Sequence, residues 1–195
     1  MEISCYEDLV LHPDQDVSSV FLMEKAMSAL HLICVESEQK YGIVNIGLGF
    51  PQYNQEKKSL GQIIRLFAHD SSILHNLSSD IRLQRLEDYI QKGEICPIPT
   101  TLRGYVQYQR MQFKENKDRL IRRFAKRHHM DIKLAENKYQ ECKKPVINLP
   151  YVTLTSSSSK KRFRLYIKES SLTENSSPLV FSSYGLTKSG VLPYF

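Results

Sequence analysis

The sequence predicts an α+β protein in two parts, an N-terminal domain over residues 1–99 and a smaller α/β domain over residues 100–195. Two observations that support this fold class are patterns of apolar residues. Short alternating segments indicate strands, and a long segment with apolar residues at helical spacing indicates a helix. The third is charge. Residues 1–99 hold 8 lysines and arginines against 14 acids, whereas residues 100–195 hold 19 against 7. The formal net charge of +6 therefore conceals a strongly basic half, which is typical of a protein that meets a polyanion.

The first half of the chain opens with a predicted strand and a predicted helix. Residues 3–11 alternate loosely and predict a strand, which Pro13 ends. Asp16 or Ser18 can cap a helix over about residues 17–36. The buried stripe that we predict for this helix repeats at helical spacing and consists of Val20, Met23, Met27, Leu30 and Cys34.

The order of the next elements suggests a known arrangement. Residues 41–50 and 60–68 predict two strands, residues 71–77 a short helix, and residues 81–91 fit either a helix or a strand. The order strand, helix, strand, strand, helix, strand is that of a ferredoxin-like (RRM-like) domain. Pro97 and Pro99 then break the chain where the charge changes sign, so we expect a domain boundary near residue 100.

The second half predicts further strands around one helix. Residues 105–113 alternate as a strand, and Asn116 can cap a helix that runs to about residue 129. Residues 146–155 and 162–168 predict two strands around a loop of serines and lysines. Residues 179–183 predict one more strand.

Several classes of protein and of site lack their sequence signatures. No apolar run approaches the roughly 18 residues that cross a bilayer, and the acidic N-terminus is unlike a secretory signal. The cysteines at positions 5, 34, 96 and 142 form no Cys-x-x-Cys pair. There is no phosphate-binding loop, no zinc-protease motif and no carboxylate cluster typical of a two-metal nuclease. We therefore expect a cytoplasmic protein with reduced thiols, no metal, no cofactor and no membrane partner.

The strongest chemical signal is a basic helix over about residues 117–129. Its cations recur at i, i+3, i+4, i+7 and i+8, within an arc of roughly 140°. They are Arg119, Arg122, Arg123, Lys126 and Arg127. Apolar residues occupy the other side of the helix, and no acid neutralises the basic side. Five like charges so close together repel one another, so this side of the helix favours a polyanionic partner.

The basic side of the helix admits other interpretations. A solvated helix face usually interleaves both signs of charge, and a membrane-surface helix needs a longer apolar face. Nucleic acid fits best, and five phosphate contacts would give a log–log salt slope of roughly −4. The helix alone does not decide between RNA and DNA.

Three residues outside this helix can read or stack on bases. Arg110 and Gln112 are two apart on a predicted strand and so point to one side. Arginine pairs well with the major-groove edge of guanine and glutamine with that of adenine. Two exposed polar residues on an ordinary strand would give the same pattern. Phe163 follows a pair of lysines and could stack on a base, although a core position explains it more simply.

Several blocks of sequence, in a fixed order, carry a resemblance to a known family. They are Ala29-Leu-His31, Gly47-Leu-Gly-Phe-Pro51, Arg110-Met-Gln-Phe-Lys-Glu-Asn116, Arg119-Leu-Ile-Arg-Arg-Phe-Ala-Lys-Arg-His128, Leu149-Pro-Tyr-Val-Thr-Leu154, Phe163-Arg-Leu-Tyr-Ile167 and Tyr184-Gly-Leu-Thr-Lys-Ser-Gly-Val-Leu-Pro-Tyr-Phe195. Over nearly its whole length the chain resembles the CRISPR-associated repeat-processing endoribonucleases of type I-F systems.

The resemblance implies a role for each matching residue. His31 would be the catalytic histidine, Ser156 would position the attacking ribose hydroxyl, and Tyr184 would orient the histidine. The run of serines leaves Ser158 as the alternative to Ser156 and as a further RNA contact. Arg110 and Gln112 would read base pairs at the foot of an RNA stem, where Phe163 would stack. The phosphate contacts in the major groove of the stem would come from Arg119, Arg122, Arg123, Lys126, Arg127 and His128.

The implied activity is that of a metal-independent endoribonuclease. It would cut CRISPR precursor RNA at the 3′ foot of the repeat hairpin by attack of a 2′-hydroxyl, leaving a 2′,3′-cyclic phosphate. The protein would stay on the mature guide RNA, join other CRISPR-associated proteins of a type I-F surveillance complex in the prokaryotic cytoplasm, and make no direct contact with DNA. A non-catalytic RNA-hairpin-binding protein of the same fold and a basic-helix DNA-binding protein are the alternatives.

Overall fold

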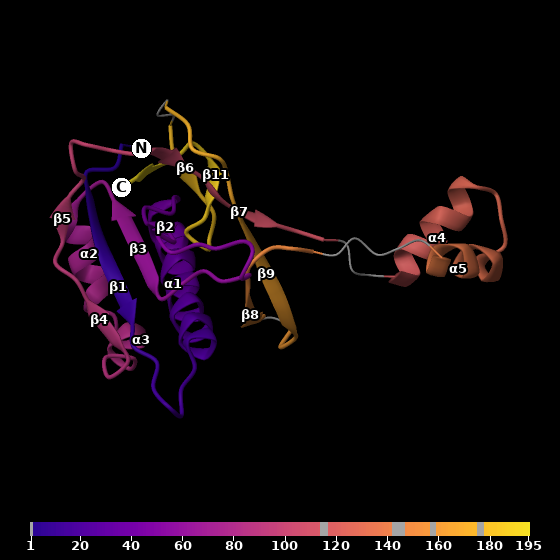
Figure 1. The fold of residues 1–195 in the computed structure, drawn as a ribbon, viewed down its shortest axis with the longest axis horizontal. Helices are drawn as coiled ribbons and strands as arrows, with labels where there is room; N and C mark the ends of the chain where they lie inside the picture. Colours follow the sequence, from indigo (N-terminus) through magenta and orange to yellow (C-terminus); the bar gives the residue numbers. More distant parts are fainter. Residues whose placement is uncertain (1, 114–116, 142–146, 157–158, 175–177) are drawn as a thin grey trace. The chain divides into compact units, whose positions relative to one another are not determined.

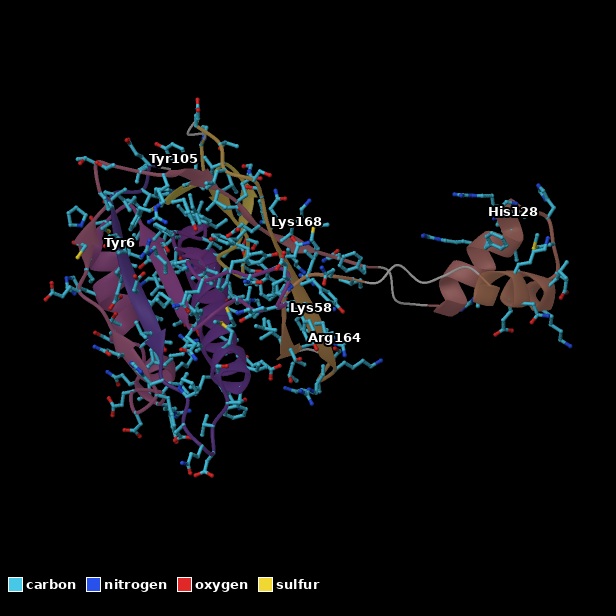
Figure 2. The ribbon with its side chains drawn as sticks, viewed as in Figure 1. Tyr6, Lys58, Tyr105, His128, Arg164 and Lys168 are labelled. Carbon is cyan, nitrogen blue, oxygen red and sulfur yellow. The ribbon has the colours of Figure 1, made fainter. Side chains whose placement is uncertain are left out.

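The computed structural model describes residues 2–113, 117–141, 147–156, 159–174 and 178–195, apart from the side chains of residues 117–120 and 139–141. The chain path is drawn in Figure 1 and the described side chains in Figure 2. The chain forms two compact units. The first combines Met1–Met111 with Leu149–Phe195, and the second is Gln112–Asn148. Among the described residues, no helix is both long and apolar enough to cross a membrane.

The first unit contains an antiparallel sheet in which β1 is central. Its main strands are β1 (Cys5–Leu11), β2 (Gly47–Gly49), β3 (Ile63–Ala68) and β4 (Ile90–Lys92), in the order β2-β3-β1-β4. The short strand β5 (Cys96–Pro97) also pairs with β1. The pairing of β1 with β3 runs from Cys5 opposite Ala68 to Val10 opposite Ile63.

Three helices with polar N-caps accompany this sheet. They are α1 (Ser19–Tyr41), α2 (Ser71–Ser78) and α3 (Ile81–Gln84). The side chains of Ser18, Asp70 and Asp80 each accept a hydrogen bond from a backbone N–H in the first turn. The first helix ends at Gly42, whose φ of 73° lies in the left-handed region that favours glycine. It therefore takes in Tyr41, where the sequence predicted the start of a strand, and β2 is correspondingly short.

The stripe predicted for α1 is mostly buried. Met23, Met27, Leu30 and Cys34 are in the core, together with Leu22, Ala26 and Ala29. The prediction was wrong for Val20, which is 63% exposed, because this first-turn residue lies beyond the buried stripe. The segment that fitted either helix or strand contains both, namely α3 and β4.

Three smaller sheets complete the first unit. β6 (Gly104–Val106) pairs with β12 (Leu192–Tyr194), and β10 (Val180–Phe181) pairs with β11 (Thr187–Ser189). β7 (Tyr108–Met111), β9 (Arg162–Glu169) and β8 (Tyr151–Thr155) form a third sheet in the order β7-β9-β8. The single strand predicted over residues 105–113 is thus two strands, β6 and β7, that belong to different sheets.

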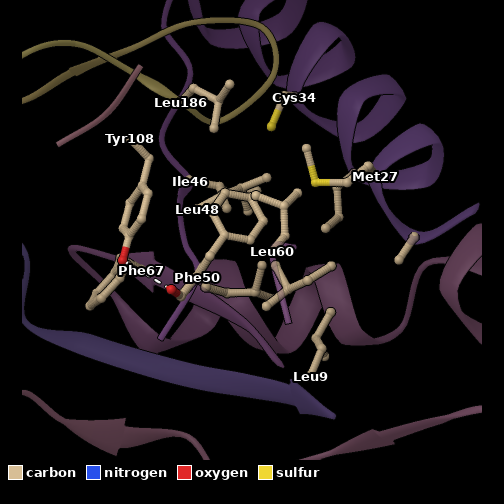
Figure 3. Packing of buried hydrophobic residues seen from close by; sticks show 14 of the residues in the cluster. Leu9, Met27, Cys34, Ile46, Leu48, Phe50, Leu60, Phe67, Tyr108 and Leu186 are labelled. Atoms are coloured by element: carbon tan, nitrogen blue, oxygen red, sulfur yellow. Dashed lines mark hydrogen bonds between the residues drawn. The ribbon is translucent and has the colours of Figure 1, made fainter. Parts of the chain in front are cut away.

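One hydrophobic core contains residues from both halves of the sequence. Tyr108 and Leu186 pack with Leu48, Phe50 and Met27 (Figure 3). The Tyr108 hydroxyl donates to the Phe50 carbonyl oxygen at 3.1 Å, and burial raises the pKa of Tyr108, which keeps that donor protonated. Because core contacts cross residue 100, the compact units divide at positions other than the boundary we expected there.

The second unit is a helix pair. It consists of α4 (Lys117–Arg127) and α5 (Ile132–Glu141). Ile121 and Ala125 of α4 are buried with Ala135 of α5, and Phe124 and Met130 pack against them. The sequence pattern did not predict α5, which has few apolar residues and hence a weak periodic signal.

Candidate active site

His31 lies on α1, where the helix borders a small hollow. Helical spacing places Ser28 one turn before His31 and Leu32 beside it, and all three line a cavity of about 200 Å³. The other lining residues come from distant parts of the chain: Leu154, Thr155, Ser156, Phe163 and Tyr184. The long helix therefore brings the imidazole to the end of the β8–β9 hairpin and to the segment after β10.

One nitrogen of the His31 imidazole is held by the backbone. Nδ1 lies 2.6 Å from the carbonyl oxygen of Ser183. A carbonyl oxygen can only accept a hydrogen bond, so Nδ1 is the donor and carries a proton. In the neutral ring the lone pair then resides on Nε2, and none of the described residues forms a hydrogen bond with that atom. The contact with Ser183 therefore makes Nε2 the atom that can take up a proton.

Tyr184 stacks on the imidazole. The two ring centroids are 4.1 Å apart and the ring planes differ by 8°. An aromatic pair of this kind contributes about 1 kcal/mol beyond the burial of its area. Together with the Ser183 bond, the stack fixes both the plane and the rotation of the His31 ring.

A glycine turn holds Ser183 and Tyr184 in place. Gly185 has a φ of 69°, its N–H donates to the Ser182 carbonyl, and its own carbonyl accepts from Leu48 of β2 at 2.8 Å. A Cβ on Gly185 would come within 2.5 Å of the Leu48 Cγ. The close approach to Leu48 and the left-handed backbone both require glycine at this position. The turn is thereby attached to the central sheet that also supports α1.

The guanidinium of Arg110 lies close to the aromatic rings of both Tyr184 and Phe163. Arg110 is exposed on β7, and its guanidinium carbon lies 5.0 Å from the Tyr184 ring centroid and 5.8 Å from that of Phe163. A guanidinium near aromatic rings gains about 0.5–1 kcal/mol at an exposed site. A second cavity, of about 500 Å³, adjoins Tyr184 and Arg110 and is also lined by Gln109, Ser182, Ser183, Thr187 and Lys188.

Ser156 lies at the first residue of the turn between β8 and β9. Its backbone N–H donates to the Lys161 carbonyl at 2.9 Å, and its hydroxyl accepts from the Ser159 N–H at 3.2 Å. The alternative serine, Ser158, lies outside the described residues. Of the two serines proposed for the catalytic role, Ser156 is the one that the described residues place at the cavity of His31.

The structure brings together five of the residues predicted for the site and its stem-foot contacts. His31, Ser156, Phe163 and Tyr184 share one cavity, and Arg110 contacts two of them. The prediction that Gln112 shares a strand face with Arg110 was wrong, because β7 ends at Met111 and Gln112 belongs to the second compact unit.

The predicted basic helix is α4 of the second unit. Its apolar side packs on α5, and the exposed side chains are those of Arg122, Arg123, Lys126, Arg127 and His128 (His128 is labelled in Figure 2). The side chain of Arg119 lies outside the described part of the helix. The His128 ring lies 4.4 Å from that of Phe124. The basic side of α4 is thus turned away from its own hydrophobic contacts.

Sequence reasoning missed one residue that acts through its backbone and several that line the two cavities. Ser183 contributes a carbonyl oxygen, which every residue type has, so no side-chain pattern could reveal it. Ser28, Gln109 and Lys188 are common surface residue types with no motif around them.

Comparison with known proteins places the chain in a family. Residues 6–195 match the model of a family described as "CRISPR-associated protein (Cas_Csy4)". The chain is 33% identical over 192 residues to a protein of Pseudomonas aeruginosa (strain UCBPP-PA14) named "CRISPR-associated endonuclease Cas6/Csy4", covering 97% of this chain and 98% of that protein. A protein of Escherichia coli (strain UTI89 / UPEC) with the same name is 29% identical over 191 residues, with 97% and 98% coverage. The chain therefore belongs to the Cas_Csy4 family of CRISPR-associated proteins.

Proposed function

We propose that this protein is an endoribonuclease that cuts CRISPR precursor RNA at the 3′ foot of the repeat hairpin, using the 2′-hydroxyl of the RNA as nucleophile and no metal ion. The relatives that match nearly the full chain are named CRISPR-associated endonucleases. The observation that carries the proposal is the His31 imidazole, which is held by Ser183 and Tyr184 beside the cavity that also contains Ser156 and Phe163.

The chemical step uses the unprotonated Nε2 of His31. Nε2 takes the proton of the 2′-hydroxyl, and the 2′-oxygen forms a bond to the adjacent phosphorus. The bond from phosphorus to the 5′-oxygen breaks, that oxygen takes up a proton from water, and the imidazolium of His31 returns its proton to water. The products are a 2′,3′-cyclic phosphate and a 5′-hydroxyl, so no water is consumed and no electrons are transferred. Because the substrate supplies the nucleophile, the reaction needs a base and an aligned geometry, and the side chains provide both.

Two side chains assist the base. Ser156 shares the His31 cavity, and its hydroxyl can donate to or accept from the 2′-oxygen and fix the ribose orientation. Tyr184 acts as a positioning residue, since its contact with His31 is a stack of rings. Ser158 remains the alternative to Ser156 in this role.

Phe163 and Arg110 are suited to hold the nucleotide at the cleavage site. The Phe163 ring lines the cavity beside His31 and Ser156, where a base at the foot of a stem can stack on it. Arg110 lies against that ring with an exposed guanidinium, which suits the O6/N7 edge of guanine. Gln112, two residues further on and the first residue of the second unit, would read an adjacent base pair.

The basic side of α4 is suited to the phosphates of the hairpin. The A-form major groove is deep and narrow along a stem, so a helix can enter it only near an end or a loop. This favours a short hairpin, with Arg119, Arg122, Arg123, Lys126, Arg127 and His128 on phosphates and with base readout confined to the foot. Residues 100–195 then hold the hairpin, while residues 1–99 supply the histidine.

The topology of the central sheet supports a ferredoxin-like (RRM-like) fold for the N-terminal part. Read from the other edge, its strand order is β4-β1-β3-β2, with α1 between β1 and β2 and with α2 between β3 and β4. We further infer that the protein stays on the cleaved guide RNA and joins other CRISPR-associated proteins of a type I-F surveillance complex in the prokaryotic cytoplasm.

Replacing His31 tests the proposed function. His31→Ala should lower the single-turnover cleavage rate of a repeat hairpin by about 10²–10⁴-fold, the usual contribution of a general base, with hairpin affinity kept. His69→Ala is the matched control, since His69 is exposed and outside the cavity. Both assays are run in excess EDTA, which should leave wild-type cleavage unchanged. Cleavage by His31→Ala at the wild-type rate would leave only a non-catalytic RNA-binding role for this site, and loss of wild-type cleavage in EDTA would refute the metal-independent mechanism.

A further inference from the structure

The three-stranded sheet β7-β9-β8 has two faces of different chemistry. Its register places Val152 opposite Leu165 and Leu154 opposite Phe163, and these residues face the core and the candidate active site. The other face, here called the outer face, carries Arg162, Arg164, Tyr166 and Lys168 of β9, Tyr151, Thr153 and Thr155 of β8, and Gln109 and Met111 of β7.

The side chains that β7, β8 and β9 contribute to the outer face include cations and no acid. One acid from outside these strands, Glu24 of α1, accepts a hydrogen bond from the Thr153 N–H at 3.0 Å. Arg162, Arg164 and Lys168 are exposed on β9, at spacings of two and four residues that place them on the same face. Figure 2 labels Arg164 and Lys168 on this strand. The one acid in the three strands is Glu169, which pairs with Tyr108 on the inner side. Ordinary solvated surfaces mix positive and negative side chains, so a row of cations without acids between them indicates an anionic partner.

Two tyrosines lie among these cations. The rings of Tyr151 and Tyr166 occupy opposed positions on β8 and β9 with centroids 5.4 Å apart. Tyr151 is 39% exposed and Tyr166 only 6%, so Tyr151 offers its ring to a base while Tyr166 supports that ring from the side. The Arg164 guanidinium lies 4.8 Å from the Tyr151 ring centroid. Planar aromatic and guanidinium groups beside a row of cations are the means by which proteins bind single-stranded RNA, with bases stacked and phosphates paired.

The outer face is continuous with the candidate active site. Arg162 and Phe163 are neighbours in β9 and point to opposite faces, while Thr155 of the outer face precedes Ser156 of the cavity. The turn between the two strands adds the exposed side chains of Lys160 and Lys161. A nucleic acid strand that leaves the His31 cavity at Phe163 can therefore reach the outer face past the exposed cations Lys160, Lys161 and Arg162.

We infer that the outer face of β7-β9-β8 binds the single-stranded RNA that continues from the 3′ side of the scissile phosphate. This inference rests on the proposed function, because it takes the cleavage site to be at His31. The 3′ flank begins at the scissile phosphate itself, next to Ser156 and Phe163, whereas the 5′ flank begins on the opposite strand of the stem. From Arg162 to Lys168 the strand spans about 20 Å, enough for a segment of a few nucleotides.

Binding of three substrate analogues tests this inference. Each carries a 2′-deoxyribose at the scissile nucleotide to prevent cleavage: the bare hairpin, the hairpin with a 3′ extension of about six nucleotides, and the hairpin with an equal 5′ extension. The wild-type protein should bind the 3′-extended hairpin about tenfold more tightly than the bare one, equivalent to the stacking of one or two bases. The salt slope should also become steeper by about two, since each phosphate on a single strand adds roughly 0.7.

A charge-neutral variant of the outer face should lose only this gain. Arg162→Gln/Arg164→Gln/Lys168→Gln should bind the bare hairpin like the wild type but show no gain from the 3′ extension. Tyr151→Ala should lose part of the gain without a change of charge. The matched control is Lys25→Gln/Lys40→Gln/Arg85→Gln, which removes three exposed cations from the helical side of the first unit and should retain the gain.

Four results would overturn the inference. They are a wild-type protein that gains nothing from the 3′ extension, a gain confined to the 5′ extension, a triple variant that keeps the full gain, and a triple variant that loses the same factor on the bare hairpin. If the wild-type protein gained nothing from the 3′ extension, the anionic partner of the outer face would be a protein and not this RNA segment. Cleavage of an all-ribose hairpin by the wild type is measured in parallel, because its absence would refute the proposed function instead.

Discussion

At the scale of single residues, the candidate site depends on how His31 is oriented rather than on a strong charge next to it. Its partners are the Ser183 carbonyl, 152 residues away in sequence, and the Tyr184 ring. No carboxylate among the described residues forms an ion pair with His31. The family resemblance predicted His31, Tyr184 and Ser156, whereas the Ser183 contact could not be predicted, since a backbone carbonyl leaves no trace in a sequence.

The role of Tyr184 can be separated into its ring and its hydroxyl. Tyr184→Phe keeps a ring to stack on His31, so cleavage should stay within a few-fold of the wild-type rate. Tyr184→Ala frees the imidazole to rotate and should lower the rate by about fivefold or more, since the stack contributes about 1 kcal/mol. Single-turnover rates and hairpin affinities of both variants check this. Equal, large losses in the two variants would assign the role to the hydroxyl and contradict the positioning by stacking.

At the scale of elements, segments with a pattern of their own were predictable, including the short helix over residues 71–77 and the strand over residues 179–183, which correspond to α2 and β10. Three of the shortest strands were not predicted as separate elements. The strand over residues 3–11, the long helix and the basic helix correspond to β1, α1 and α4. The strands β6, β11 and β12 have three residues each, too few to show a period, and their partners lie far away in sequence. Likewise, the left-handed Gly42 ends α1, and it lies beyond the point where the apolar stripe of the helix stops.

An ion-pair network between α1 and α3 predicts a pH dependence of stability. Arg82 donates to Asp80 and, at 2.7 Å for both oxygens, to Glu36 of α1. Hydrogen bonds from Arg82 hold the pKa of Asp80 and of Glu36 below their ordinary values. Folded-state pKa values below the unfolded ones, which are about 4, mean that this stabilisation is present above pH 4 and is lost as the pH falls through the folded values.

Arg82→Gln should remove this pH dependence. At pH 7 the variant should be less stable than the wild type by about 1 kcal/mol in urea unfolding, and the difference should shrink toward zero as the pH is lowered below the unfolded-state pKa values of about 4. Arg85→Gln is the control, because Arg85 is an exposed cation three residues further along the chain. A difference between wild type and Arg82→Gln that is the same at every pH would contradict the assignment.

At the scale of the whole molecule, the charge reversal near residue 100 does not mark the boundary between the compact units. These units divide at Met111 and Leu149, because Tyr108 and Leu186 of the second half of the sequence pack into a core with residues of the first half. Contacts of high sequence separation of this kind follow from packing, and no local pattern predicts them. The second unit, Gln112–Asn148, contains the basic helix α4.

Removing two arginines from α4 measures its share of the RNA binding. Arg122→Ala/Arg123→Ala should weaken hairpin binding and reduce the magnitude of the salt slope by roughly two, because each arginine neutralises about one phosphate. Lys133→Ala/Lys138→Ala changes the charge of the same unit equally but leaves α4 intact, and it should keep the wild-type slope. If the arginine variant kept the wild-type slope, α4 would not be the phosphate-binding element.

The central claim is that His31 activates the 2′-hydroxyl of the RNA at the cavity it shares with Ser156 and Phe163. The most direct measurement is single-turnover cleavage of a repeat hairpin in which only the 2′-hydroxyl at the mapped scissile position is replaced by hydrogen. The proposed mechanism predicts that cleavage at this position stops while the hairpin binds as before. Continued cleavage at the same phosphate would contradict it, because the 2′-oxygen would then not be the nucleophile.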